Sequence, residues 1–143
     1  MATTTYLANP VVTVGASSGS ATDLTDQCIA AVFTQNYDQL EATAFGQTNR
    51  QYVKGLSDVS LTLTFLTSYA ASETYAVLQP LVGAAATYVS VKPTSSADGA
   101  TNPKFELTNG FLASMDYINA SLGELSQLQV VFTGGTVSID TTP

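Results

Sequence analysis

The residues that most often perform catalysis are almost missing from this sequence. It contains no histidine and a single cysteine, Cys28, which excludes a His general base, a Cys-His pair, a Ser-His-Asp triad and a His-based metal site. Lys54 and Lys92 lack the S-x-x-K spacing that places a serine one helical turn from its lysine. We therefore expect that the chain is not an enzyme and has no catalytic residue.

Two carboxylates in "DLTDQC", Asp23 and Asp26, are the candidates for an ion site. They could converge on a calcium ion if the turn folded back, because hard cations accept several oxygen ligands from one loop. We favour a polar turn in which Asp23 or Thr25 bonds nearby backbone N–H groups. We accordingly expect no metal, no cofactor and no small-molecule substrate.

Composition and charge narrow the classes of partner. The chain is 45% hydrophobic but only 10% charged, and its net charge is −7. Binding to a phosphate backbone depends on clustered Lys and Arg, so four basic side chains argue against a nucleic-acid-binding protein. The acidity is compatible with a surface past which DNA slides without sticking. A neutral, Thr-rich surface suits strands whose outer side touches other protein, since a hydroxyl is easier to desolvate than a charge.

The length of 143 residues predicts one domain over residues 1–143, with short flexible segments at the N- and C-terminal ends. Cys28 cannot form an internal disulfide, and we expect it to be buried as a small apolar residue. The sequence begins without a basic, then hydrophobic, leader pattern and has no run of roughly 18 apolar residues. We expect a soluble chain made in the cytoplasm that does not contact a membrane.

Alternating apolar and polar residues predict about seven strands. The clearest is "DVSLTLTFLT", in which Val59, Leu61, Leu63 and Phe65 alternate with Asp58, Ser60, Thr62 and Thr64. The other predicted strands are Val11 to Val14, about residues 27 to 38, "TYVSVKP", "KFELTNGFLASMDYIN", "LSQLQVVFTGG" and "TVSI". Phe33, Phe65 and Phe132 are expected in the core, and the tyrosines at an edge or interface.

One segment has a helical pattern instead. "SYAASETYAVLQPLVG" contains helix formers and predicts one helix over about residues 71 to 82. Ser72 could cap its start, Gly83 is a natural residue just after its end, and Pro80 predicts an irregular last turn. The fold class that follows is mainly β: an antiparallel β-sandwich or barrel with one helix on its flank or across one end.

The dipeptide Asn109-Gly110 leaves the strand that contains it ambiguous. It could form a tight type I′ hairpin turn or a glycine bulge that bends one long strand. We favour the bulge, because "NASLG" gives a better turn just afterwards.

The stretch "ATAFGQTNRQYVKGLSD", residues 42–58, holds two of the four basic side chains, Arg50 and Lys54. Glycines and polar residues predict a loop between two apolar segments. The cations could pair within the chain, with Glu41 or Asp58, or with acidic groups on a neighbouring molecule. Both interpretations are open at this point.

The sequence as a whole resembles the small single-domain major tail (tube) proteins of long, non-contractile-tailed bacteriophages. The resemblance covers about residues 20 to 135. It is carried by the "TAFG…R…GL.D" loop before an amphipathic strand, by "KPTS…A…TNP", and by the late "G.L…VVF.GG" strand.

This resemblance implies a virion structural protein of the tail that forms stacked, hexameric rings around a channel. DNA would then be only non-specific passing cargo, and the partners would be further copies of the chain and other virion proteins. The loop would contact a neighbouring subunit or ring through Phe45, Gly46, Arg50, Tyr52, Lys54 and Gly55. Two alternatives are a phage capsid decoration (cement) protein and, less in keeping with the absence of Trp, a carbohydrate-binding β-sandwich module.

Overall fold

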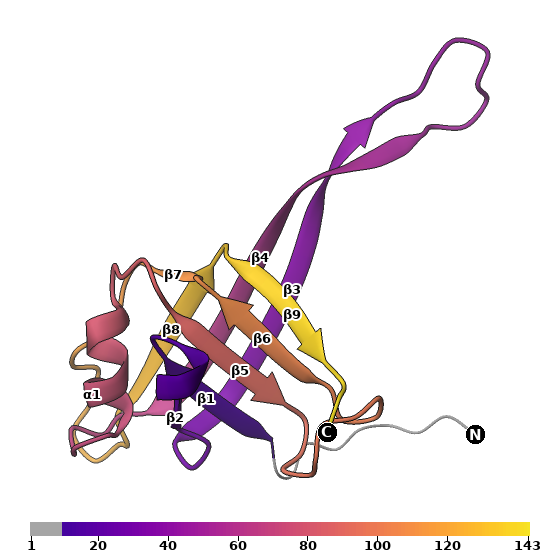
Figure 1. The fold of residues 1–143 in the computed structure, drawn as a ribbon. Helices are drawn as coiled ribbons and strands as arrows, with labels where there is room; N and C mark the ends of the chain where they lie inside the picture. The colour runs from indigo at the N-terminus through magenta and orange to yellow at the C-terminus, as the bar shows by residue number, and fades with distance from the viewer. Residues whose placement is uncertain (1–9) are drawn as a thin grey trace.

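The computed structural model describes residues 10–143, which fold into two packed antiparallel sheets with a long hairpin projecting from one of them (Figure 1). Sheet A has the strand order β2-β1-β5-β6-β9, and sheet B has the order β3-β4-β8-β7. The strands are β1 (Val11–Gly15), β2 (Thr22–Asp23), β3 (Cys28–Glu41), β4 (Tyr52–Leu66), β5 (Tyr88–Lys92), β6 (Lys104–Thr108), β7 (Phe111–Leu112), β8 (Gln127–Thr133) and β9 (Thr136–Asp140). The predicted β-sandwich is confirmed.

The core lies between the sheets and follows the period-two pattern of the sequence. On β8, and on β4 from Val59 onward, every second side chain is fully buried while its neighbours point outward. Phe65 and Phe132 are both fully buried, as predicted, whereas Phe33 is only half-buried at the margin of the core. The remaining fully buried apolar side chains are Val12, Val14, Leu24, Val59, Leu61, Leu63, Leu78, Val89, Leu107, Leu112, Leu128 and Val130.

The one α-helix among residues 10–143 is shorter than the sequence indicates. α1 spans Thr74–Leu78, and a 3-10 turn, η2 (Gln79–Leu81), continues it through Pro80. The irregular last turn is therefore confirmed, as is the left-handed residue after it, since Gly83 has φ +73°. Ser72 is not the cap: it has φ +62°, and Glu73 occupies the capping position. A second short 3-10 turn, η1, spans Ser18–Ser20. Within residues 10–143, no helix has the length and apolar character that crossing a bilayer requires.

The Asn109-Gly110 dipeptide forms neither a hairpin nor a bulge. It carries the chain from sheet A to sheet B, because β6 pairs with β5 and β9 whereas β7 pairs with β8. Asn109 adopts a left-handed backbone conformation, with φ +60°, at this change of direction. The return crossing at Gly134-Gly135 packs tightly against it, and a Cβ on Gly135 would lie 2.6 Å from the Thr108 carbonyl oxygen.

The strand predicted through Met115 and Tyr117 stops much earlier. β7 ends at Leu112, and residues 113–126 form an irregular loop that leads into β8. The alternation of Phe111, Ala113 and Met115 was misleading, because no neighbouring strand lies beside this segment to complete a ladder.

Candidate functional site

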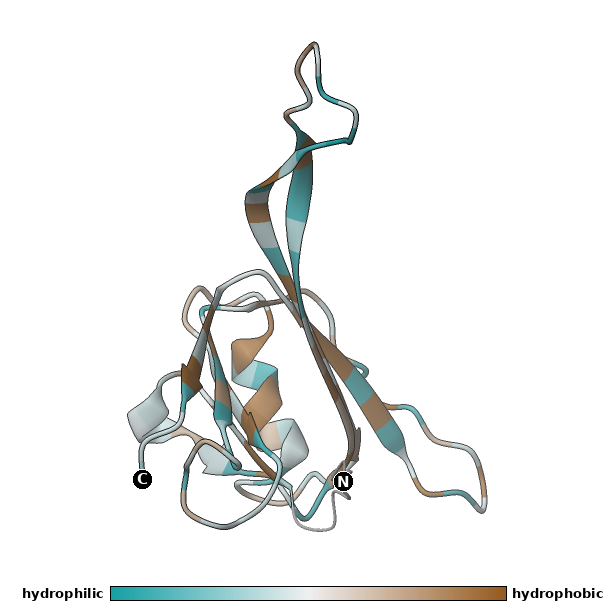
Figure 2. Cartoon of the chain, turned by 90° about the vertical axis from the view of Figure 1, so that its right-hand side faces the viewer, coloured by the Kyte–Doolittle hydropathy of each residue, from teal (hydrophilic) through white to brown (hydrophobic). Residues whose placement is uncertain are grey.

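The hairpin of β3 and β4 extends well beyond the sandwich, and its outer part, residues 36–58, is here termed the arm (Figures 1 and 2). Val59 is the last buried residue of β4 on the way out, and almost every arm residue is exposed. The arm nevertheless carries large apolar side chains on its surface: Tyr37, Leu40, Phe45, Tyr52, Val53 and Leu56. An isolated two-stranded hairpin is at best marginally stable in water, so this composition indicates a surface that other protein covers.

A bulge in the middle of the arm depends on a glycine. The register shifts between the pairs Tyr37↔Ser57 and Gln39↔Lys54, where Asp38 lies opposite Gly55. A Cβ on Gly55 would lie 2.9 Å from the Cβ of Asp38. Gly55 therefore permits a close approach of the two strands and fixes the direction of the outer half of the arm.

The tip of the arm, residues 42–51, is held by local hydrogen bonds. The Ala42 amide donates to the Gln51 carbonyl at 2.8 Å, and the Ala44 amide donates to Oε1 of Gln47 at 2.7 Å. Gly46 supplies the left-handed residue, with φ +86°. Phe45, beside it, has a relative exposure of 109%, so the turn presents a phenyl ring entirely to solvent.

The six residues that the sequence assigns to a contact loop divide between two elements. Phe45, Gly46 and Arg50 lie in the tip, whereas Tyr52, Lys54 and Gly55 belong to β4. The predicted loop of residues 42–58 is therefore too long, because β4 already begins at Tyr52. The structure brings Lys54 to Tyr37 across the hairpin, with its Nζ 5.0 Å from the ring centroid.

Neither cation of the arm forms an ion pair within the part of the chain that the structure describes. The salt bridges among residues 10–143 involve only the other two cations, Lys92 and Lys104. Glu41 and Asp58, the possible internal partners, do not bind Arg50 or Lys54. The arm therefore presents two positive charges that no carboxylate among the described residues neutralises by a salt bridge.

Lys92 and Lys104 secure the loop of residues 93–103 against sheet A. Lys92 Nζ lies 3.1 Å from Asp98 Oδ1 and donates to the Ser96 carbonyl at 2.9 Å. Lys104 Nζ lies 3.2 Å from Glu106 Oε1, 3.5 Å from Asp98 Oδ2 and 3.8 Å from Asp140 Oδ2. The hydrogen bond to Glu106 is the main cause that raises the pKa of Lys104.

Two further groups in this neighbourhood have shifted pKa values. Burial, followed by the charge of Glu106, raises the pKa of Tyr88. Hydrogen bonds from Thr142 lower the pKa of Asp140. Lys104 is the common neighbour of this cluster, since it forms ion pairs with Asp98, Glu106 and Asp140 and its charge also acts on Tyr88.

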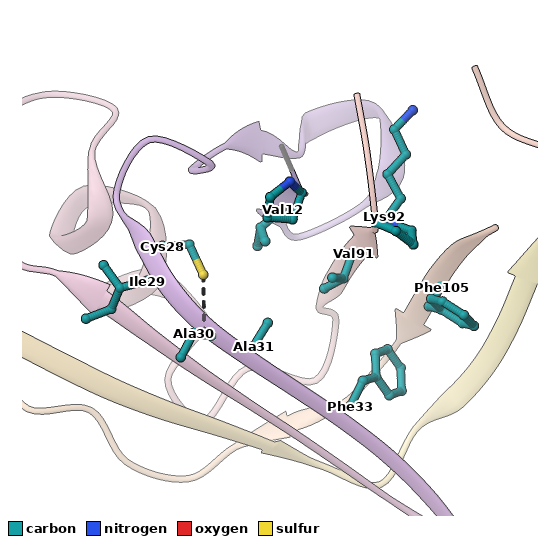
Figure 3. Close-up of a pocket in the computed structure, with 11 residues that line it drawn as sticks. Val12, Cys28, Ile29, Ala30, Ala31, Phe33, Val91, Lys92 and Phe105 are labelled. Atoms are coloured by element: carbon teal, nitrogen blue, oxygen red, sulfur yellow. Dashed lines mark hydrogen bonds between the residues drawn. The ribbon is translucent and has the colours of Figure 1, made fainter. Parts of the chain in front are cut away.

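An apolar groove opens along the margin where β3 faces sheet A (Figure 3). It has a volume of about 470 Å³ and is lined mainly by apolar side chains, among them Val12, Ile29, Phe33, Val91 and Phe105. β3 is the edge strand of sheet B, so its outer backbone groups are also free to pair. The groove and the edge together form a second surface suited to contact with protein.

Cys28 lines this groove and is half-buried rather than fully buried. Its Sγ donates to the Ala30 carbonyl at 3.4 Å (Figure 3), and burial raises the pKa of its thiol. A raised pKa keeps the sulfur protonated and unreactive, so the small apolar role expected for Cys28 fits its surroundings.

The "DLTDQC" segment forms the polar turn that the sequence favours. The backbone amide of Thr25 donates to Asp23 Oδ1 at 2.9 Å, and the Thr25 hydroxyl donates to the same oxygen. Among residues 10–143 there is no group of three or more acidic or cysteine side chains placed to hold a metal ion.

Two surfaces are not predicted by the sequence pattern. The loop of residues 113–126 exposes Ile118, Leu122 and Leu125, for which the pattern predicts a strand or a turn. In addition, sheet B without the arm contains no charged residue. This part of the sheet comprises residues 28–35, 59–66, 111–112 and 127–133. That second feature is visible in the sequence once the strand register is known.

Comparisons with known proteins find similarity in structure but not in sequence. No sequence family matches the chain, and no curated protein matches it. A chain in the sheath/tube terminator of an extracellular contractile injection system has a TM-score of 0.69 at 14% identity, covering 97% of this chain and 98% of that one. A chain in the tube-terminating cap of the anti-feeding prophage has a TM-score of 0.68 at 17% identity, covering 99% of this chain and 94% of that one.

A third similar chain comes from the tail of an empty gene transfer agent particle. It has a TM-score of 0.65 at 12% identity and covers 93% of this chain and 95% of that one. The chain thus has the fold of proteins in tails and injection tubes of phage-like particles. Some of these structures belong to contractile systems. The fold therefore does not confirm the non-contractile type of tail that the sequence resemblance implies.

Proposed function

We propose that this chain is a structural subunit of a tail tube, which oligomerises into stacked rings around a channel that conducts DNA. The single observation that carries the proposal is the arm: an exposed hairpin with apolar side chains and two cations that lack partners among the described residues. A monomer in solution gains nothing from such a feature, whereas an assembly covers it.

The fold supports rings of six, because the similar gene transfer agent tail was determined with C6 symmetry. The free edge of β3 and the adjoining groove provide a lateral surface by which one subunit can contact the next within a ring. The arm projects away from this body (Figure 1). Its proposed role is to contact a subunit of another ring. The tail is proposed to be of the non-contractile type, following the resemblance in sequence.

The outer face of sheet B is proposed to line the channel. We call it the neutral face, and the strand register places these side chains on it: Ala30, Val32, Thr34, Ser60, Thr62, Thr64, Gln129, Val131 and Thr133. A wall without Lys or Arg offers DNA no counterion-releasing contact, so DNA passes without being held. Replacing Thr62 and Thr64 with Lys should make assembled tubes bind DNA in a salt-dependent manner, unlike tubes of the wild type.

Electron microscopy of the purified chain tests the proposal directly. Rings and hollow tubes are the expected result, and sixfold averages of the rings would support the stoichiometry. Monomers or trimers that adhere only to phage heads would contradict it and would favour a capsid decoration protein. Locating the chain by labelled antibody on virions, on the tail shaft or on the head, provides an independent check.

A further inference from the structure

The end of the molecule opposite the arm has an exposed apolar surface of its own. We call it the pole surface, and it consists of Tyr69, Tyr117, Ile118, Leu122 and Leu125. Ile118 and Leu125 are 80% and 79% exposed, and Leu122 has a relative exposure of 106%. Side chains of this size, left in water and close together in sequence, indicate an interface.

The pole surface is fixed to the body rather than free. The Tyr69 hydroxyl donates to the Tyr117 carbonyl at 2.5 Å, and the Tyr75 ring lies between the two tyrosines, with centroid distances of 5.4 Å to Tyr69 and 6.2 Å to Tyr117. The Ser126 hydroxyl donates to the Asn119 carbonyl at 2.7 Å. A surface held in this way is already organised to receive a partner.

A hollow of about 430 Å³ opens beside Leu125 on this surface. Its walls are Asn119, Ser121, Glu124, Leu125 and Gln127. The hollow therefore has one apolar wall, several neutral polar groups and one exposed carboxylate. Leu125 offers an apolar contact to an arriving ring, and Glu124 offers a counter-charge to an arriving cation.

The register of sheet B places the pole surface and the arm tip at opposite ends. Cys28, where β3 begins, pairs with Phe65, and Leu66, where β4 ends, pairs with Gln127, where β8 begins. The amide of Thr67 donates to the Ser126 carbonyl at 2.9 Å, so the loop of residues 113–126 ends beside the far end of β4. The tip lies at the other end of the same two strands, as Figure 1 shows.

Charge distinguishes the two ends as well. The segments that build the pole surface, residues 66–73 and 113–126, contain Glu73, Asp116 and Glu124 but no Lys or Arg. None of these carboxylates forms a salt bridge among residues 10–143. The tip carries Arg50, which also lacks an acidic partner there. The charges that are unpaired at one end are thus complementary to those unpaired at the other.

We infer that the pole surface is the receptor for the arm tip of a second copy of this chain. Phe45 of the arriving tip occupies the hollow beside Leu125, and Arg50 pairs with Glu124 and Asp116. The inference rests on the proposed function, since it supplies the partner surface for the arm. Because the contact joins two different surfaces, it is heterologous, and their position at opposite ends of the molecule suits propagation along the axis of a stack.

A cysteine pair tests this contact without disturbing the charges. Phe45→Cys and Leu125→Cys are combined with Cys28→Ala, and assembled material is oxidised and run on a non-reducing gel. A ladder of disulfide-linked oligomers is expected. The matched control pairs Phe45→Cys with Ile139→Cys, an exposed position on β9 of sheet A, and should give no ladder.

Charge reversal provides the second test. Arg50→Glu and Glu124→Arg should each raise the protein concentration needed for stacking about tenfold or more. Mixing the two variants should restore long stacks of alternating subunits, because the normal tip of one meets the normal pole of the other and the reversed tip meets the reversed pole. Both substitutions in one chain should restore long stacks.

The outcomes separate the inference from the proposed function. If the wild type forms stacked rings but the Phe45–Leu125 cysteine pair gives no ladder and the double charge reversal restores nothing, the receptor is elsewhere and only the inference fails. If the wild type forms neither rings nor tubes at any concentration, the proposed function fails. A ladder together with restoration by the double reversal would establish the contact.

Discussion

Two segments of this protein each have a pair of cations and use them in opposite ways. Lys92 and Lys104 flank the loop of residues 93–103; they bind Asp98, Glu106 and Asp140, and the loop lies against sheet A. In the arm, Arg50 and Lys54 bind no carboxylate among the described residues, and the tip stands away from the body. The two pairs of cations therefore differ in role: Lys92 and Lys104 stabilise the fold, whereas Arg50 and Lys54 are available to a partner.

The largest expected effect comes from reversing the charge of the arm. Arg50→Glu together with Lys54→Glu should abolish the formation of tubes, because like charges would then meet at the contact. The temperature of unfolding of the monomer should change little, since neither side chain forms a salt bridge within residues 10–143 and the contact of Lys54 with the Tyr37 ring is exposed. Electron microscopy and circular dichroism measure the two properties. Arg50→Lys with Lys54→Arg keeps the charges and serves as the control; normal tubes from the reversed variant would refute a docking role for the arm.

Matched asparagines compare the two loops in stability. Asn102 is buried, accepts from the Thr94 amide, and donates to the carbonyls of Thr94, Ser96 and Ala97. Asn102→Ala should lower the free energy of unfolding by about 2 kcal/mol, because buried backbone groups lose their partner. Asn49→Ala, in the exposed tip, should change it by less than about 0.5 kcal/mol. Chemical denaturation measures both, and equal effects would show that the loops do not differ as described.

Matched lysines give a smaller difference. Lys104→Met removes three ion pairs of a side chain that is 28% exposed, and should lower the free energy of unfolding by about 1 kcal/mol or less. Lys54→Met should leave the stability of the monomer nearly unchanged. The effect at Lys104 should shrink as salt is added. A larger effect at Lys54 than at Lys104 would reverse the assignment of structural and available cations.

The pH dependence is the most subtle test. The pKa of Lys104 is raised above 10.5 in the fold, so its contribution is fully present below that pH and is lost as the pH rises through the raised value. The pKa of Tyr88 is raised above 10.0, which means that the fold disfavours its phenolate, and this also lowers stability at alkaline pH. We expect the free energy of unfolding to fall above about pH 10, with a smaller slope in Lys104→Met than in Lys54→Met. Identical slopes in the two variants would contradict it.

Local patterns were sufficient for much of the fold. Alternation over Val59 to Phe65 and over Leu128 to Phe132 predicted β4 and β8 with their buried faces. Pro80 and Gly83 predicted how the helical segment ends. These features succeeded because they depend on the residues within one element.

Several of the failures involve neighbours that are distant in sequence, whereas the misplaced helix cap at Ser72 is a local one. Residues 113–117 alternate like a strand but have no strand beside them. Asn109-Gly110 connects the two sheets, because β6 before it pairs with β9 and β7 after it pairs with β8. Phe33 alternates like a core residue, yet β3 is an edge strand, so its ring is only half-buried. Period two shows which side chains share a face but not whether another sheet covers that face.

For the candidate site, too, only the features that are local in the sequence were predicted. The concentration of Arg50 and Lys54 in one stretch is a fact of the sequence, and it located the tip of the arm. The pole surface could not be predicted, because it combines residues 66–73 with residues 113–126 through the pairing of β4 with β8.

The sequence by itself determined a β-rich chain with a strong negative charge and without the side chains of common catalytic sites, since composition and period-two alternation are local properties. Only the tertiary structure decided which cations are paired, how far the arm projects, and that an acidic, apolar surface lies at the end opposite the arm. These depend on the register of strands far apart in the chain, which brings together or separates groups whose distance in space the order of residues does not specify.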